Sequence, residues 1–125
     1  MNLLLDTHFL LWWLDDAKAL SPKARKLIAS TDNLVFISAV SVWELRIKEA
    51  LGKIELPRKF GAVLDEQPFE HLSITVSHSN SVRSLPAHHR DPFDRMLIAQ
   101  ARVESLTLVT HDEVVQRYDV ACAIV

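Results

Sequence analysis

The sequence predicts one α/β domain built on a parallel β-sheet. Short apolar stretches alternate along the chain with segments that have helical patterns, as is typical of parallel strands joined by right-handed helical crossovers. At 125 residues the chain is long enough for one hydrophobic core, and its 49% hydrophobic and 24% charged residues are ordinary for a globular protein. We therefore expect a single domain over residues 1–125.

The N-terminal part of the chain predicts a strand and two helices. Leu3–Leu5 is a short apolar stretch of the kind that forms a buried strand. The residues His8–Leu14 are apolar on more than one side of a helix, so we expect part of this helix, including a tryptophan, to face a partner. Ser21 and Pro22 are typical of an N-cap and a first helical turn, which predicts a second helix after them.

The next segment predicts a second strand and a third helix. Leu34–Ile37 is continuously apolar, like a strand buried on both faces of a parallel sheet. A helix follows over about Val42–Leu51, and Ser41 and Glu44 have the spacing of a capping box at its start. Gly52 is suited to close this helix because glycine readily adopts the left-handed conformation.

The middle of the chain predicts three further helices and a third strand. A short helix is expected over Lys59–Glu66, a strand over Phe69–Ile74, and a weakly helical segment over Val76–Leu85. Asp91 is a good N-cap and a proline follows it, which predicts a long helix over Pro92–Glu104.

The C-terminal part predicts a fourth strand over Leu106–Val109, a short helix over Glu113–Tyr118 and a final strand over Ala121–Val125. Cys122 is the only cysteine, so an internal disulfide is excluded and a buried thiol in a reducing compartment is expected. No stretch resembles a signal peptide or a transmembrane helix. We expect a cytoplasmic protein without a membrane partner.

The net charge of -2 argues against a protein that binds nucleic acid through a basic surface. It does not exclude a nuclease, because an acidic site can bind the phosphate backbone through metal ions. The histidines lack the spacing of a zinc site, and no motif indicates a serine or cysteine nucleophile.

Four acidic residues form the candidate site: Asp6, Glu44, Asp94 and Asp112. Each has a structural explanation of its own. Asp6 and Asp112 follow strands and are suited to cap helices, and Glu44 completes the capping box. Asp94 lies in a first helical turn, where the helix dipole favours negative charge.

These separate explanations do not account for the joint pattern of the acids. All four lie at one end of three parallel strands or on helices that leave that end, where open α/β sheets bind ligands. Neighbouring strands are about 4.8 Å apart, so the carboxylates should converge, and the pKa of at least one should rise unless a cation neutralises them. Hard oxygen ligands suit Mg²⁺ or Mn²⁺, and the corresponding reaction is metal-assisted hydrolysis of a phosphodiester.

Other polar residues near these acids have two explanations each. Thr7, Ser38 and Thr110 either orient ligands and water around a metal or make ordinary hydrogen bonds at strand ends. Arg90 and Arg95 either contact phosphates, pair with a neighbouring acid or are solvated.

Several stretches together carry a resemblance that covers nearly the whole chain. They are Leu3–His8, Ser38–Leu45 with Gly52-Lys53, His89–Arg95 with Ala99–Ala101, and Leu108–Asp112. In their order and spacing they resemble PIN domains, and more closely the toxin ribonucleases of VapBC-type toxin–antitoxin pairs. One departure is His111, which stands where the family often has asparagine or arginine.

The resemblance implies a PIN-like fold, with about five parallel strands in the order 3-2-1-4-5 flanked by helices. It also implies that Asp6, Glu44, Asp94 and Asp112 match the acidic quartet that binds Mg²⁺ or Mn²⁺ and hydrolyses RNA. Such toxins are usually homodimers that cut structured RNA. A small cognate antitoxin neutralises them by placing its C-terminal segment in a groove near the active site.

Three other functions are alternatives to a metal-dependent ribonuclease. A haloacid-dehalogenase-like phosphatase needs a second acid two residues after Asp6, where this chain has His8. A phospho-receiver domain needs an aspartate after the third strand, where this chain has Ser73-Ile74-Thr75, and a lysine near its last strand, but none follows Tyr118. The remaining alternative is a metal-binding regulatory or interaction module of the same fold without nuclease activity.

Overall fold

The computed structural model describes residues 1–125, and its centre is a parallel sheet with the strand order β3-β2-β1-β4-β5. This confirms both the parallel sheet and the order 3-2-1-4-5. The strands are β1 (Asn2–Leu5), β2 (Leu34–Ser38), β3 (Glu70–Leu72), β4 (Thr107–Thr110) and β5 (Cys122–Ile124). Because β1 pairs in parallel with both β2 and β4, the carboxyl ends of these three strands meet at one edge of the sheet.

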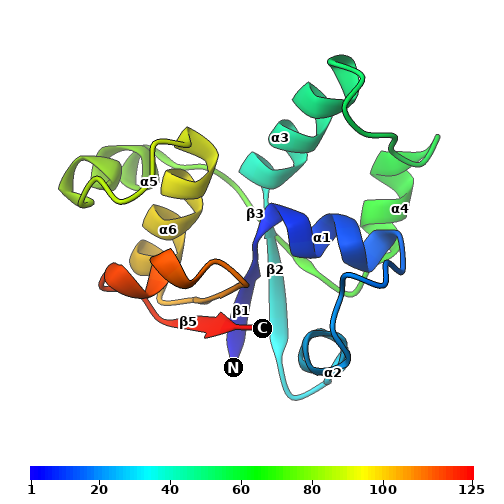
Figure 1. Ribbon diagram of the computed structural model, residues 1–125, viewed down its shortest axis with the longest axis horizontal. Coiled ribbons are helices and arrows are strands. Elements are labelled where there is room, and N and C mark those ends of the chain that lie inside the picture. Colours follow the sequence, from blue (N-terminus) through cyan, green and yellow to red (C-terminus); the bar gives the residue numbers. More distant parts are fainter.

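Helices cover both faces of the sheet. The α-helices are α1 (Thr7–Leu14), α2 (Pro22–Ala29), α3 (Ala39–Ala50), α4 (Phe60–Glu66), α5 (Val76–Ser81) and α6 (Pro92–Glu104), and two short 3₁₀ helices are η1 (Val82–Ser84) and η2 (Glu113–Arg117). Figure 1 shows α1, α2 and α4 on one side of β1 and β2, and α5 and α6 on the other. None of the helices has both the length and the apolar character that crossing a bilayer requires.

The core consists of two apolar layers, one on each face of the sheet. Leu3 and Leu5 pack with Phe9 of α1 in the first layer, whereas Leu4 packs with Leu97 of α6 in the second. The side chains of successive strand residues point to opposite faces, so β1 contributes to both layers. All three leucines are fully buried, which explains why this strand is apolar without alternation.

The helix after β2 begins earlier than the predicted Val42. The chain passes from β2 into α3 without a loop, and the hydroxyl of Ser38 accepts a hydrogen bond from the backbone N–H of Val40 at 3.1 Å. Ser41 lies inside the helix, where its hydroxyl accepts a hydrogen bond from Thr7. The predicted capping box of Ser41 and Glu44 is therefore wrong, because the serine at the strand end is the one that meets the free N–H groups.

The other predicted helix ends agree with the structure. Ser21 caps α2 by accepting a hydrogen bond from the N–H of Ala24, and Asp91 caps α6 by accepting one from the N–H of Phe93 at 2.8 Å. Gly52 has a φ of 72° after the end of α3, in the left-handed region that favours glycine.

Two predicted elements near the sheet edges are shorter or divided. The third strand was predicted over Phe69–Ile74 but is confined to the three residues of β3. The segment Val76–Leu85 forms α5 and then η1 rather than one helix. Cys122 lies on the edge strand β5 and is half-buried, not buried as predicted, because no further strand covers that edge.

Candidate active site

Two of the candidate acids lie at the carboxyl ends of neighbouring strands. Asp6 follows β1, and its carboxylate accepts hydrogen bonds from the N–H of His8 and from the hydroxyl of Thr110, each at 2.9 Å. Asp112 follows β4 and accepts a hydrogen bond from the N–H of Val114 at 3.0 Å. Thr110 also accepts a hydrogen bond from the N–H of Asp112, so one hydroxyl joins the two acids. Both aspartates thus cap helices and also lie at the carboxyl edge of the sheet, where a ligand was expected.

The third acid, Asp94, reaches the same place from α6. Asp6, Asp94 and Asp112 line one open cavity of about 530 Å³, together with His8 and His111. Beneath it the same three aspartates meet an apolar floor formed by Leu97, Ile98, Leu108 and Val115. Acids from three separate elements therefore converge as the joint pattern predicted.

Glu44, the fourth candidate, stands apart from this cavity. It is almost buried on α3, and its carboxylate forms an ion pair with Lys48 at 2.8 Å, one helical turn later. Its negative charge still acts on Asp94. The structure thus brings three of the four acids to one cavity and places Glu44 beside them, neutralised by a lysine.

The pKa of Asp94 reflects its burial and the carboxylates around it. Burial, followed by the negative charges of Asp91, Asp6 and Glu44, raises the pKa of Asp94 from 3.8 to about 6, and His89 partly opposes this shift. A raised pKa is the response expected where like charges crowd without a compensating cation.

The pKa values of the other two aspartates move in the opposite direction. For Asp6, burial opposes ionisation, but hydrogen bonds from His8 and Thr110 and the charge of His8 outweigh it and lower the pKa. For Asp112, burial is likewise outweighed, chiefly by the hydrogen bond from His89. The contact with Asp6 in turn raises the pKa of His8.

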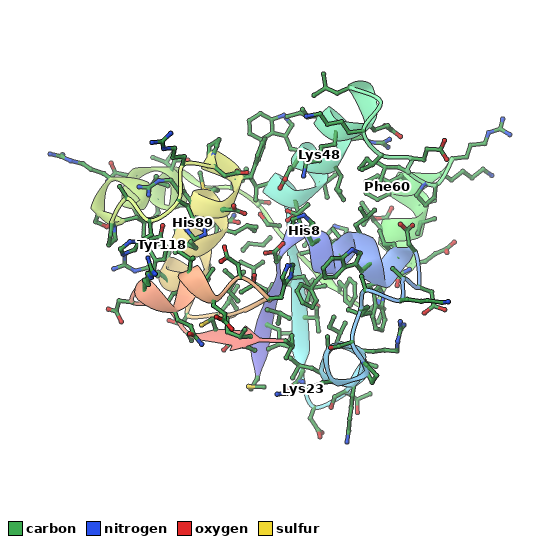
Figure 2. All side chains as sticks on the ribbon, in the orientation of Figure 1. His8, Lys23, Lys48, Phe60, His89 and Tyr118 are labelled. Atoms are coloured by element: carbon green, nitrogen blue, oxygen red, sulfur yellow. The ribbon has the colours of Figure 1, made fainter.

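His89 is a site residue that the sequence analysis did not identify. Its Nε2 lies 2.6 Å from Oδ2 of Asp112, and its Nδ1 lies 2.9 Å from the hydroxyl oxygen of Tyr118, whose ring it stacks on. In Figure 2 His89 and Tyr118 lie together on the α6 side of the site, whereas His8 and Lys48 lie on the side of α1 and α3. No local sequence pattern predicts these contacts, because His89 is far from Asp112 and Tyr118 in the sequence.

Among the predicted neighbours of the acids, only Thr110 contacts one. Thr7 donates to Ser41 and Ser38 donates to Gln100, so both make ordinary hydrogen bonds at strand ends. Arg95 does not form the predicted pair with Asp91. Its guanidinium donates hydrogen bonds to the backbone carbonyl oxygens of Pro86, Val82 and Leu85, which holds the segment before α6. Arg90 is exposed.

The donor set suits a hard cation in its chemistry, although the side chains are not arranged as a closed site. The cavity presents carboxylate oxygens, which Mg²⁺ and Mn²⁺ prefer, and burial together with the neighbouring negative charges raises the pKa of Asp94. However, no three histidine, cysteine, aspartate or glutamate side chains are close enough together to hold one ion. Asp6 and Asp112 are instead occupied by hydrogen bonds from the protein.

Comparisons with known proteins agree with this geometry. The family model described as "PIN domain" matches residues 3–121. Ribonuclease VapC22 of Mycobacterium tuberculosis is 32% identical over 115 residues, which cover 89% of this chain and 87% of that protein.

Solved structures of similar fold include two complexes. One is VapBC2 from Rickettsia felis bound to a DNA fragment from their promoter, with a TM-score of 0.74, 17% identity and 98% of each chain covered. The other is DNA-bound VapBC from Salmonella typhimurium, with a TM-score of 0.71, 18% identity, and 98% of this chain and 97% of that one covered. These structures support the fold, and the family match over nearly the whole sequence, with the 32% identical relative, shows that the chain belongs to the PIN domain family.

Proposed function

We propose that this protein is a metal-dependent endoribonuclease and the toxin of a type II toxin–antitoxin pair. One observation carries the proposal: in a PIN domain, Asp6, Asp94 and Asp112 come from three separate elements and line one open cavity. The similarity to a protein named ribonuclease VapC22 supports RNA as the substrate.

Asp6, Asp94 and Asp112 would hold Mg²⁺ or Mn²⁺ after their side chains turn toward the cavity that they share. Glu44 would serve as a fourth ligand only after it leaves Lys48. When bound, such an ion lowers the pKa of water and stabilises negative charge on a phosphate. The protein's own residues prepare the ligands. Thr110 orients Asp6, and His89 orients Asp112, through the hydrogen bonds described above. The apolar floor keeps water from the inner side of the carboxylates.

The proposed reaction is the hydrolysis of an RNA phosphodiester. Water attacks the phosphorus in line with the bond to the 3′ oxygen; a new oxygen–phosphorus bond forms and the bond to the 3′ oxygen breaks. The 3′ oxygen leaves with a proton, so the products are a 5′-phosphate and a 3′-hydroxyl. The carboxylates of the site neutralise no phosphate charge by themselves, so RNA cleavage in this site should depend on the added cation.

The proposed partners are a cognate antitoxin and a second copy of this chain. The similarity in fold to VapBC complexes supports an antitoxin. A second open cavity, of about 520 Å³, lies between α3, α4 and β3, and its lining includes Val42, Leu64 and the half-exposed Trp43. Such an apolar groove suits an antitoxin segment. A structured cellular RNA as the target would be met in the cytoplasm.

The test is a cleavage assay on total RNA with purified protein freed of antitoxin, with and without Mn²⁺. We expect cleavage that needs Mn²⁺ and that Asp94→Asn abolishes. The matched control is Asp32→Asn, because Asp32 is an exposed acid just before the amino end of β2, at the opposite edge of the sheet. Calorimetric titration with Mn²⁺ reports metal binding independently of activity.

Three results would count against the proposal. Cleavage that persists in purified Asp94→Asn, or cleavage that does not require metal, would contradict the assigned site. Mn²⁺ binding without cleavage of any RNA would favour the alternative of a regulatory or interaction module.

A further inference from the structure

A group of aromatic rings lines the cavity beside its carboxylates. His8 and His111 both line the cavity that Asp6, Asp94 and Asp112 share. His111 stacks on Trp12 of α1, with ring centroids 5.3 Å apart and an angle of 28° between the planes. His8 lies 6.1 Å from His111 in an edge-on arrangement.

The two histidine rings are exposed at the cavity, whereas Trp12, on which they pack, is held by the core. His111 is exposed, the side chain of His8 is 55% exposed, and Trp12 is half-buried against the core layer of α1. His8 also contacts Trp12, with ring centroids 5.8 Å apart. In Figure 2 His8 lies near the centre of the molecule, at the carboxyl end of β1. The rings therefore form a supported surface at the cavity rather than loose side chains.

Aromatic side chains of this kind bind unpaired nucleobases. Proteins hold single-stranded RNA by stacking bases on aromatic side chains, and every base offers a flat face for this contact. A phosphate group has no flat face, so stacking on the rings distinguishes a base from a phosphate. The acids proposed to act on the phosphodiester line the same cavity, so a base on the histidines would lie next to its own phosphate.

We propose that His8 and His111 bind a nucleobase of single-stranded RNA beside the phosphate that is cleaved, and thereby position the substrate. This inference rests on the proposed function and adds a base-binding surface to the acidic site. The substrate would be an unpaired stretch, such as the loop of a structured RNA. His111 is the central residue of this surface, because it lines the cavity and also stacks on Trp12.

The test measures RNA binding in a protein that cannot cleave. In the Asp94→Asn background with Mg²⁺, fluorescence anisotropy compares a labelled ten-nucleotide oligoadenylate with an abasic ribose-phosphate chain of the same length. The abasic chain keeps the phosphates but cannot stack. We expect His111→Ala to weaken oligoadenylate binding roughly tenfold and to leave abasic binding unchanged.

Two variants separate stacking from charge and from general damage. His111→Phe keeps an aromatic ring without an ionisable group, so binding of oligoadenylate should be retained. His71→Ala is the matched control, since His71 is an exposed histidine on β3 that lines a different cavity.

The inference is overturned if the Asp94→Asn protein binds oligoadenylate no better than the abasic chain, or if His111→Ala weakens both equally. Loss of oligoadenylate binding in His111→Phe as well would also overturn it, because a charge contact would then explain the effect. Cleavage by the wild-type protein tests the proposed function separately, so failure of one is distinguishable from failure of the other.

Discussion

Asp94→Asn should stabilise the metal-free protein while it destroys the proposed activity. The rise of the pKa of Asp94 from 3.8 to about 6 corresponds to about 3 kcal/mol for ionising this carboxyl in the folded protein. Asp94 is only partly buried, so solvent screening reduces this to roughly 1–2 kcal/mol. The loss of a negative charge from the first turn of α6 subtracts about 0.3–1 kcal/mol. A net gain of about 1 kcal/mol remains at neutral pH.

The gain should depend on pH in a defined direction. Since the pKa of Asp94 is higher in the folded protein than in the unfolded chain, the folded state binds this proton more tightly. The contribution of Asp94 to stability is therefore most favourable below about pH 4 and falls as the pH rises to about 6. Asparagine does not ionise, so Asp94→Asn should match the wild type near pH 4 and exceed it at pH 7.5.

Urea unfolding and thermal unfolding in EDTA at both pH values measure this difference, with Asp32→Asn as the exposed control. At pH 7.5 the melting temperature of Asp94→Asn should be about 4 °C higher than that of the wild type. Added Mn²⁺ should reduce or reverse the difference, because the wild type gains binding energy that the variant has lost. An equal effect at pH 4 and pH 7.5, or destabilisation at pH 7.5, would refute the conclusion that burial and neighbouring carboxylates make the ionisation of Asp94 unfavourable.

Three further predictions concern the groups around the acids and the core. His89→Ala removes the contact that holds Asp112, so kcat for RNA cleavage should fall roughly tenfold with little change in KM. His89→Gln, which can donate one hydrogen bond, should retain part of the kcat that His89→Ala loses. An equal loss of kcat in the two variants would argue against a role of His89 in positioning Asp112. Thr110→Val keeps the shape but not the hydroxyl bonded to Asp6; we expect lower cleavage and a loss of about 1 kcal/mol in the free energy of unfolding, measured by urea titration. Leu4→Ala should cost about 2–5 kcal/mol by the same measurement, because Leu4 is fully buried in β1; a cost below 1 kcal/mol would contradict its place in the core.

The sequence by itself determined the features that depend on neighbouring residues. The alternation of apolar stretches and helical segments predicted the parallel sheet, and Asp91 and Gly52 marked helix ends through their own conformational preferences. The resemblance to PIN domains supplied the strand order. Asp6 and Asp112 could be placed at one edge of the sheet because parallel strands end together.

Only the tertiary structure decided which side chains meet within the site. Glu44 pairs with Lys48 rather than lining the cavity, and His89 bridges Asp112 and Tyr118. Glu44 and Lys48 have the i, i+4 spacing of a helical ion pair, but only the tertiary structure shows that this pair lies beside the cavity and not in it. The contacts of His89 do not follow from spacing, because its partners come from distant segments. The same holds for the ring stack of Trp12 and His111, whose members are separated by most of the chain and meet only because β1 and β4 are neighbours. Local propensity acts over a few residues, whereas a site is made by contacts that exist only after the sheet has formed.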